Sequence, residues 1–183
     1  TVLTQEVHRD MAQYTSISEN GPSAGNMFAL FESAAIAHSE RPFLIVDTKP
    51  LMSYGDMLTQ TGQAASWLRS LGVGVGDRVV VQAHKSPASV VLYLACLRAG
   101  AVFIPLNTAY QESELSYFLS DAEPSLLVAS QGLPAETAAF AGARAVISGD
   151  TKAAPWLQND DQLATVELQP NDPAAILYTS GTT

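Results

Sequence analysis

Apolar residues recur along this chain with two periods, one typical of helices and one typical of buried strands. From Asn26 to His38 they recur at intervals of three and four residues, which predicts a helix with one apolar face. Residues 43–46 and the valine run within residues 78–83 are continuous instead, as in strands buried on both faces. Helical and strand patterns then alternate along the chain.

Polar and turn-forming residues mark where the longer helices begin and end. Ser53 followed by Asp56 resembles a capping box and predicts a long helix that ends at Gly72. Ser86-Pro87 supplies an N-cap and a first helical residue for a helix that reaches Arg98 and closes at Gly100. Further strands are expected at residues 101–105, 125–129 and 144–147, and further helices at residues 115–122 and 135–141.

This alternation predicts an α/β fold with a largely parallel sheet layered with helices on both faces. Residues 1–25 lack periodicity and are expected to form a flexible N-terminal tail. Residues 148–173 are rich in Asn, Asp, Gln and Pro and predict a surface loop with some short structure. The chain is expected to re-enter the sheet at Ala174 as a buried strand, so residues 26–183 form one incomplete domain.

Charge and cysteine content exclude several function classes. The 183 residues are 47% apolar and carry a formal charge of -9, which argues against a nucleic-acid or anionic-membrane surface. Apolar runs fall well short of the roughly 20 residues of a membrane span, and the first 25 residues hold no apolar signal core. The single Cys96 lies in an apolar run, where a buried, inert thiol is expected, so we predict a cytoplasmic protein.

The last residues predict a loop that binds phosphate groups. An apolar stretch from Ala174 leads directly into Tyr178-Thr179-Ser180-Gly181-Thr182-Thr183. Hydroxyl donors, close-lying backbone N–H groups and a glycine free to adopt positive φ suit a loop that wraps a polyphosphate. A Ser/Thr/Gly run is also typical of an ordinary turn or linker, but its position after a strand of a parallel sheet favours phosphate binding.

Other candidate sites give weaker patterns. The glycines of residues 72–76 lie between a helix and the next strand, the reverse of a dinucleotide-binding loop, and indicate a turn. His8, His38 and His84 are too scattered for a metal site, and none is predicted. Lys85 and Ser86 follow a strand at a helix N-terminus, where an anion contact is plausible; the alternative is a capped turn with a solvated lysine.

These residues resemble the adenylate-forming family that comprises acyl- and aryl-CoA synthetases, peptide-synthetase adenylation domains and luciferases. Residues 178–183 resemble the first half of its signature, which continues with a glycine, two variable or proline positions, a lysine and a glycine. Residues 97–107 resemble a second family motif, and Gly76-Asp77-Arg78-Val79 and Glu114-Leu115 lie at familiar distances from it. The resemblance implies part of the large N-terminal AMP-binding domain, truncated within the phosphate-binding loop.

The resemblance also implies a two-step reaction. ATP and a carboxylate give an acyl-adenylate and pyrophosphate, and a thiol, usually coenzyme A, displaces AMP to leave a thioester. Thr179, Ser180, Gly181, Thr182 and Thr183 are the implied phosphate-binding residues, with catalytic groups expected downstream of Thr183. ATP, Mg²⁺ and coenzyme A are the implied cofactors of the full-length enzyme, and these 183 residues without the C-terminal part are expected to bind none tightly and to be inactive.

Within the family the closest resemblance is to malonyl-CoA synthetases, which use a short dicarboxylic acid. It rests on Asn26-Met27-Phe28, Lys85-Ser86 and the segments 90–94 and 105–110. Two alternatives stay open: a non-catalytic α/β binding or scaffold module, and a peptide-synthetase adenylation domain that loads a carrier thiol.

Overall fold

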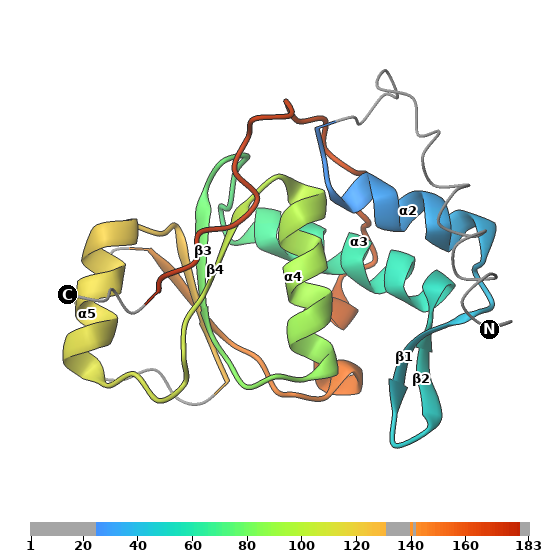
Figure 1. Cartoon of the computed structure of the whole chain (residues 1–183), viewed down its shortest axis with the longest axis horizontal. Helices are drawn as coiled ribbons and strands as arrows, with labels where there is room; N and C mark the ends of the chain where they lie inside the picture. The colour runs from blue at the N-terminus through green and yellow to red at the C-terminus, as the bar shows by residue number, and fades with distance from the viewer. Residues whose placement is uncertain (1–24, 131–139, 141, 180–183) are drawn as a thin grey trace, which may run out of the picture.

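The described residues of the chain, 25–130, 140 and 142–179 of the computed structural model, form an α/β fold (Figure 1). Four strands make a parallel sheet, and two more make a separate antiparallel hairpin. In chain order the helices, strands and 3-10 turns are α2 (Phe28–Ala37), β1 (Pro42–Val46), β2 (Lys49–Ser53), α3 (Tyr54–Ser70), β3 (Arg78–Gln82), α4 (Pro87–Ala99), β4 (Val102–Pro105), α5 (Glu112–Ala122), β5 (Leu126–Ala129), β6 (Ala143–Val146), η3 (Thr151–Ala153) and η4 (Pro155–Gln158).

The parallel sheet has the strand order β4-β3-β5-β6, with β3 and β5 inside. Val80 of β3 is level with Ile104 of β4 and with Leu127 of β5. Helices lie on both faces, α3 and α4 on one and α5 on the other, which confirms the predicted fold class (Figure 1). Because both faces are covered, β3 and β5 have continuous apolar runs in place of alternating ones.

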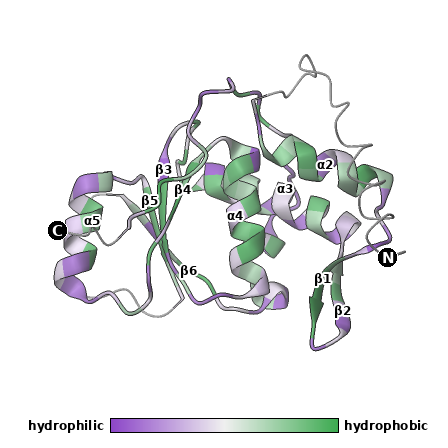
Figure 2. Cartoon of the chain, in the orientation of Figure 1, coloured by the Kyte–Doolittle hydropathy of each residue, from purple (hydrophilic) through white to green (hydrophobic). Residues whose placement is uncertain are grey.

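Two hydrophobic clusters hold these layers together. Val79 and Val81 of β3 face α4 and α3, whereas Val80 faces Leu115 and Leu119 of α5. Successive side chains of a strand point to opposite faces, so one strand contributes to both clusters. Figure 2 shows apolar residues along most of α4, in agreement with its position between the sheet and α3.

The predicted helix boundaries are confirmed by their caps. Ser53 Oγ accepts the N–H of Asp56 at 3.1 Å while the Asp56 carboxylate accepts the N–H of Ser53 at 2.9 Å, a complete capping box. Ser86 caps α4 in the same reciprocal way with Ser89. Gly100 ends α4 with φ of 70°, the left-handed conformation that favours glycine.

One predicted strand is placed wrongly. Residues 43–46 were expected to be a buried strand, but β1 pairs antiparallel with β2 in a separate hairpin (Figure 2). Ile45 and Val46 of β1 are exposed. Asp47 and Thr48 both have positive φ, 47° and 67°, and this two-residue turn sends the chain straight back. The Asp-Thr pair lacks the glycine that normally announces such a turn.

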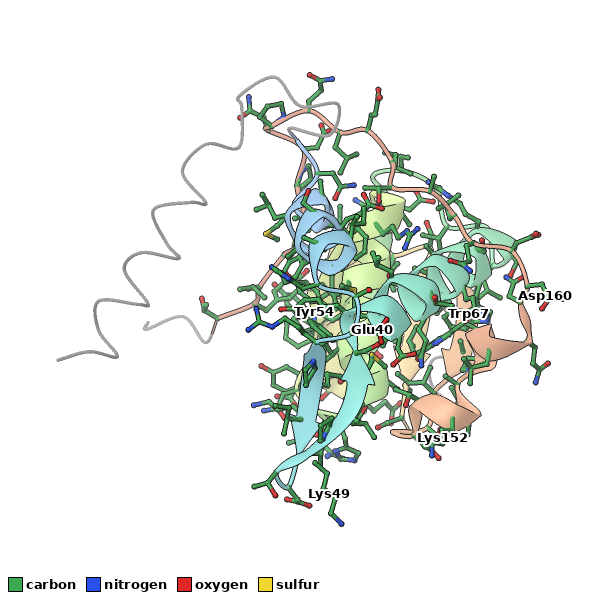
Figure 3. The ribbon with its side chains drawn as sticks, turned by 90° about the vertical axis from the view of Figure 1, so that its right-hand side faces the viewer. Glu40, Lys49, Tyr54, Trp67, Lys152 and Asp160 are labelled. Carbon is green, nitrogen blue, oxygen red and sulfur yellow. The ribbon has the colours of Figure 1, made fainter. Side chains whose placement is uncertain are left out.

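The predicted surface loop at residues 148–173 is only partly a surface loop. It holds the short turns η3 and η4, as expected, yet Trp156 on η4 is fully buried and its ring lies 5.8 Å from that of Trp67 on α3. Figure 3 views the molecule from the side of the hairpin. In this view Trp67 of α3 lies on the same side of the molecule as Lys152 and Asp160, near these turns. The expected helix at residues 135–141 falls almost wholly outside the described residues.

Arg98 joins the layers on the α4 side of the sheet. It is 7% exposed, its Nε donates to the Leu163 carbonyl at 2.7 Å, and its Nη1 donates to the Leu58 carbonyl at 2.7 Å. The guanidinium lies 5.3 Å from the centre of the Phe28 ring. Burial lowers the pKa of Arg98 from its usual value, and the nearby negative charge of Glu32 opposes that shift. One side chain of α4 thus contacts α3, α2 and the segment after η4.

Replacing Arg98 with methionine is expected to lower the free energy of unfolding by about 2–4 kcal/mol, because two partly buried carbonyl groups each lose their bond to the guanidinium. Urea unfolding of the 183-residue chain measures the change. The control Arg41→Met removes a charge from an exposed position and is expected to change stability by less than about 0.5 kcal/mol. Equal stability of the two variants would show that Arg98 contributes nothing through these bonds.

Candidate functional site

The segment that leads to the predicted phosphate-binding loop lies beside β4. The N–H of Phe103 donates to the Ala174 carbonyl at 3.0 Å and the N–H of Ile176 donates to the Phe103 carbonyl at 3.1 Å, forming a parallel bridge between Phe103 and Ala175. The chain therefore re-enters the sheet at Ala174, as predicted. The expected burial is wrong: Ile176 and Leu177 are exposed, because within the described residues this segment pairs with β4 alone.

Thr179 is exposed and directly follows this segment. Its hydroxyl can donate to a phosphate oxygen. The other predicted loop residues, Ser180, Gly181, Thr182 and Thr183, lie outside the described residues.

Lys85 and Ser86 follow β3 at the carboxyl edge of the sheet, where ligands of parallel α/β sheets bind. Ser86 is the N-cap of α4, where its hydroxyl accepts the Ser89 N–H at 3.2 Å, and Lys85 is exposed. A Cβ on Gly149 would lie 3.3 Å from Ser86 Cβ, so the turn after β6 packs against this cap. Because β4 lies between β3 and the segment at Ala175, that segment and β3 are two strands apart, on the order of 10 Å.

Tyr178, directly before Thr179, is fixed to α5 by its ring and by its hydroxyl. Its ring centre lies 4.6 Å from that of Phe118, and its hydroxyl donates to Asp121 Oδ2 at 2.6 Å. Burial, followed by the hydrogen bond to Asp121 and its negative charge, raises the pKa of Tyr178 to about 12, while Arg78 opposes the shift. No local sequence pattern indicates this pair, since Tyr178 and Asp121 are 57 positions apart.

The two other motifs behind the family resemblance form a turn that joins α4 to the sheet. The N–H of Gly76 donates to the Gly100 carbonyl at 2.7 Å, and the N–H of Val102 donates to the Asp77 carbonyl at 2.8 Å. Asp77 Oδ2 also accepts the Gly74 N–H at 2.6 Å. The described parts of both motifs therefore set the direction of β3 and β4 and do not themselves present a reactive group.

The described residues offer no cluster of three or more His, Cys, Asp or Glu side chains that suits a metal ion. Burial raises the pKa of the Cys96 thiol, in keeping with the expected inert cysteine. Among the helices of the described segments, none combines the length and the apolar character needed to cross a bilayer.

Residues 31–183 match the family of AMP-binding enzymes, which covers most of the chain. The chain belongs to this family. With the layered parallel sheet, the match identifies the fold as that of the N-terminal domain of adenylate-forming enzymes. The resemblance stated from the motifs is thereby confirmed at the level of the family.

Three similar proteins show the range of the AMP-binding family around this chain. The L-proline--[L-prolyl-carrier protein] ligase of Pseudomonas fluorescens is 32% identical, over 81% of this chain and 31% of its own. A probable CoA ligase of Humulus lupulus is 32% identical, over 84% of this chain and 32% of its own. The ATP-bound structure of MatB from Rhodopseudomonas palustris is 37% identical with a TM-score of 0.73, over 87% of this chain and 33% of its own. The chain thus spans about a third of each relative.

Gly100→Ala is expected to destabilise the chain more than Gly72→Ala, although both glycines have positive φ. The Gly72 substitution costs about 1–2 kcal/mol for the left-handed backbone alone, since a Cβ there meets no atom within 4 Å. At Gly100 the added Cβ would also lie 3.0 Å from Leu168 Cδ2 and 3.3 Å from Val75 Cγ1. Thermal unfolding of both variants tests this order, and equal losses would contradict it.

The phenol of Tyr178 is expected to lose its proton near pH 12 in the folded chain, against an ordinary pKa of 10.0. Because the folded-state pKa is raised, the contact stabilises the fold fully below about pH 10 and is lost as pH rises toward 12. The tyrosinate absorbance of the chain minus that of Tyr178→Phe measures this pKa. The same difference in denaturant, the control, should titrate near 10, and a folded-state midpoint there would contradict the prediction.

Proposed function

We propose that this chain is part of an ATP-dependent acyl-CoA ligase that activates a carboxylic acid as an acyl-adenylate and transfers the acyl group to coenzyme A. The observation that carries the proposal is the parallel bridge of Ala175 with β4. It holds the segment that leads into the hydroxyl- and glycine-rich stretch beginning at Thr179 beside the sheet. The family match through Thr183 supports the same assignment.

The reaction has two balanced steps. A carboxylate oxygen attacks the α-phosphorus of ATP, the bond to the β-phosphate oxygen breaks, and pyrophosphate leaves with its electron pair. The sulfur of a thiolate then attacks the acyl carbon, and AMP leaves as the thioester forms. The first step converts a poor electrophile into a mixed anhydride with a good leaving group. Negative charge that develops on the departing phosphates needs preorganised donors.

Within this chain we assign that donor role to Thr179, Ser180, Gly181, Thr182 and Thr183. Hydroxyl and backbone N–H groups bind phosphate oxygens without a charge of their own, so Lys85, which follows β3 at the N-terminus of α4, is assigned as a further anion contact. Ser86 supports Lys85 by capping α4. Magnesium would be held by residues beyond the described segments, and catalytic groups are expected downstream of Thr183. The single buried Cys96 agrees with a reaction in the cytoplasm.

A carrier-protein ligase is the second candidate, because the L-proline--[L-prolyl-carrier protein] ligase is as similar to the chain as the probable CoA ligase is. Both candidates share the adenylating step and differ in the thiol that accepts the acyl group. For the acid we propose a short dicarboxylate such as malonate. The motif resemblance to malonyl-CoA synthetases and the 37% identity to MatB support that choice.

Expression of the complete reading frame that encodes these residues allows a direct test. With malonate as the acid we expect acid-dependent exchange of labelled pyrophosphate into ATP, and with coenzyme A we expect a thioester and AMP. Acetate, propionate and L-proline serve as comparison acids. If none of the tested acids supports exchange, the non-catalytic scaffold becomes the better explanation.

The acceptor is tested separately from the acid. Formation of malonyl-CoA from free coenzyme A supports the ligase, whereas exchange without thioester formation on coenzyme A, but with loading of a carrier protein, supports the second candidate. The variant Thr179→Val tests the role of the loop, because it keeps the β-branched shape and removes the hydroxyl. It is expected to lower kcat/KM for ATP about tenfold.

A further inference from the structure

Backbone hydrogen bonds to the sheet hold the chain before the phosphate-binding loop only as far as Ile176. Its N–H donates to the Phe103 carbonyl, and in the described residues no later residue of this segment bonds to β4 through its backbone. Leu177 is 70% exposed. The next residue with contacts to the fold is Tyr178, whose side chain contacts α5. Thr179 is the residue between Tyr178 and Ser180.

The contact of Tyr178 with α5 has two independent parts. The hydroxyl-to-carboxylate bond to Asp121 is 2.6 Å long, the length typical of strong bonds to a charged acceptor. The ring packs on Phe118, which also lies 5.0 Å from the ring of Tyr110, so an aromatic cluster fixes the plane of Tyr178. Together they define both the position and the orientation of the side chain.

Asp121 is at a position of α5 where a carboxylate does not stabilise the helix itself. Asp121 lies in the last turn of α5, where the negative end of the helix dipole disfavours a carboxylate. Leu115, Leu119 and Ala122 bind α5 to the sheet, whereas Asp121 is exposed and takes no part in that core. Its carboxylate accepts the Tyr178 hydroxyl, and this bond offsets the unfavourable position at the end of the helix.

We propose that Tyr178 and Asp121 act as positioning residues that fix where the phosphate-binding loop leaves the sheet. The inference rests on the proposed function, because it assigns the contact to placing the ATP phosphates. The sheet bond at Ile176 and the α5 contact at Tyr178 fix the backbone up to the residue directly before Thr179. Donors placed in advance bind the developing charge without reorganisation, and small displacements of such donors reduce the rate.

The test uses the product of the complete reading frame and the variants Tyr178→Phe, Asp121→Ala, Asp121→Asn and the double variant Tyr178→Phe/Asp121→Ala. Tyr178→Phe keeps the ring on Phe118 and removes only the hydroxyl. Asp121→Asn keeps an acceptor oxygen for that hydroxyl and removes the charge. Tyr117→Phe is the matched control, since Tyr117 also contacts Phe118 with its ring, is 62% exposed, and loses the same atom.

Tyr178→Phe and Asp121→Ala are each expected to lower kcat/KM for ATP in pyrophosphate exchange about tenfold. KM for the carboxylate is expected to stay within about twofold, because the lost bond acts on the phosphate side. The double variant should lose no more than either single variant, Asp121→Asn should recover most of the activity, and Tyr117→Phe should match the unmodified enzyme.

The outcomes separate this inference from the proposed function. If the unmodified enzyme catalyses exchange but Tyr178→Phe changes only the melting temperature, or changes both substrates equally, the contact is merely structural and the inference is wrong. Additive losses in the double variant would likewise overturn it, since the two residues would then act separately. If none of the acids supports pyrophosphate exchange by the unmodified enzyme, the proposed function is wrong and the inference that rests on it is wrong too.

Discussion

The buried guanidinium of Arg98 is the constraint on which the rest of the structure depends. A charged group in the interior is costly unless its hydrogen bonds are satisfied, and here backbone carbonyls of Leu58 and Leu163 satisfy them. This requirement holds α3 and the segment after η4 at one distance from α4. Two residues later, Gly100 turns the chain into β4, so the position of that strand follows from the same contacts.

The path from Arg98 to the candidate site runs through β4. Phe103 of β4 is the residue to which the segment at Ala175 pairs, and Tyr178 then ties the same segment to α5. The motif at residues 97–107 therefore links a buried structural cation to the strand that supports the loop. A motif shared with a family can thus consist of residues that support a site and do not contact its ligand.

Local signals in the sequence were sufficient for the elements whose stability is local. The caps at Ser53 and Ser86, the glycine at position 100 and the valine run of β3 each state their role within a few residues, and the structure confirms them. The β1–β2 hairpin was missed because its turn lacks glycine. The buried Trp156 and the pair of Tyr178 with Asp121 depend on contacts between distant segments, which no local pattern encodes.

The chain is 32% identical both to a carrier-protein ligase and to a probable CoA ligase. This similarity indicates which steps of the proposed reaction this part of the protein serves. Enzymes that use different thiols have the adenylating step in common, and a region similar to both is expected to build that step. The contacts of the described residues agree with this division: β4 and α5 fix the segment up to Tyr178, directly before the proposed phosphate-binding loop, and ATP supplies the same phosphates whichever acid is activated. Selection for the acid and the thiol then acts on other residues, while the placement of Thr179 can stay the same.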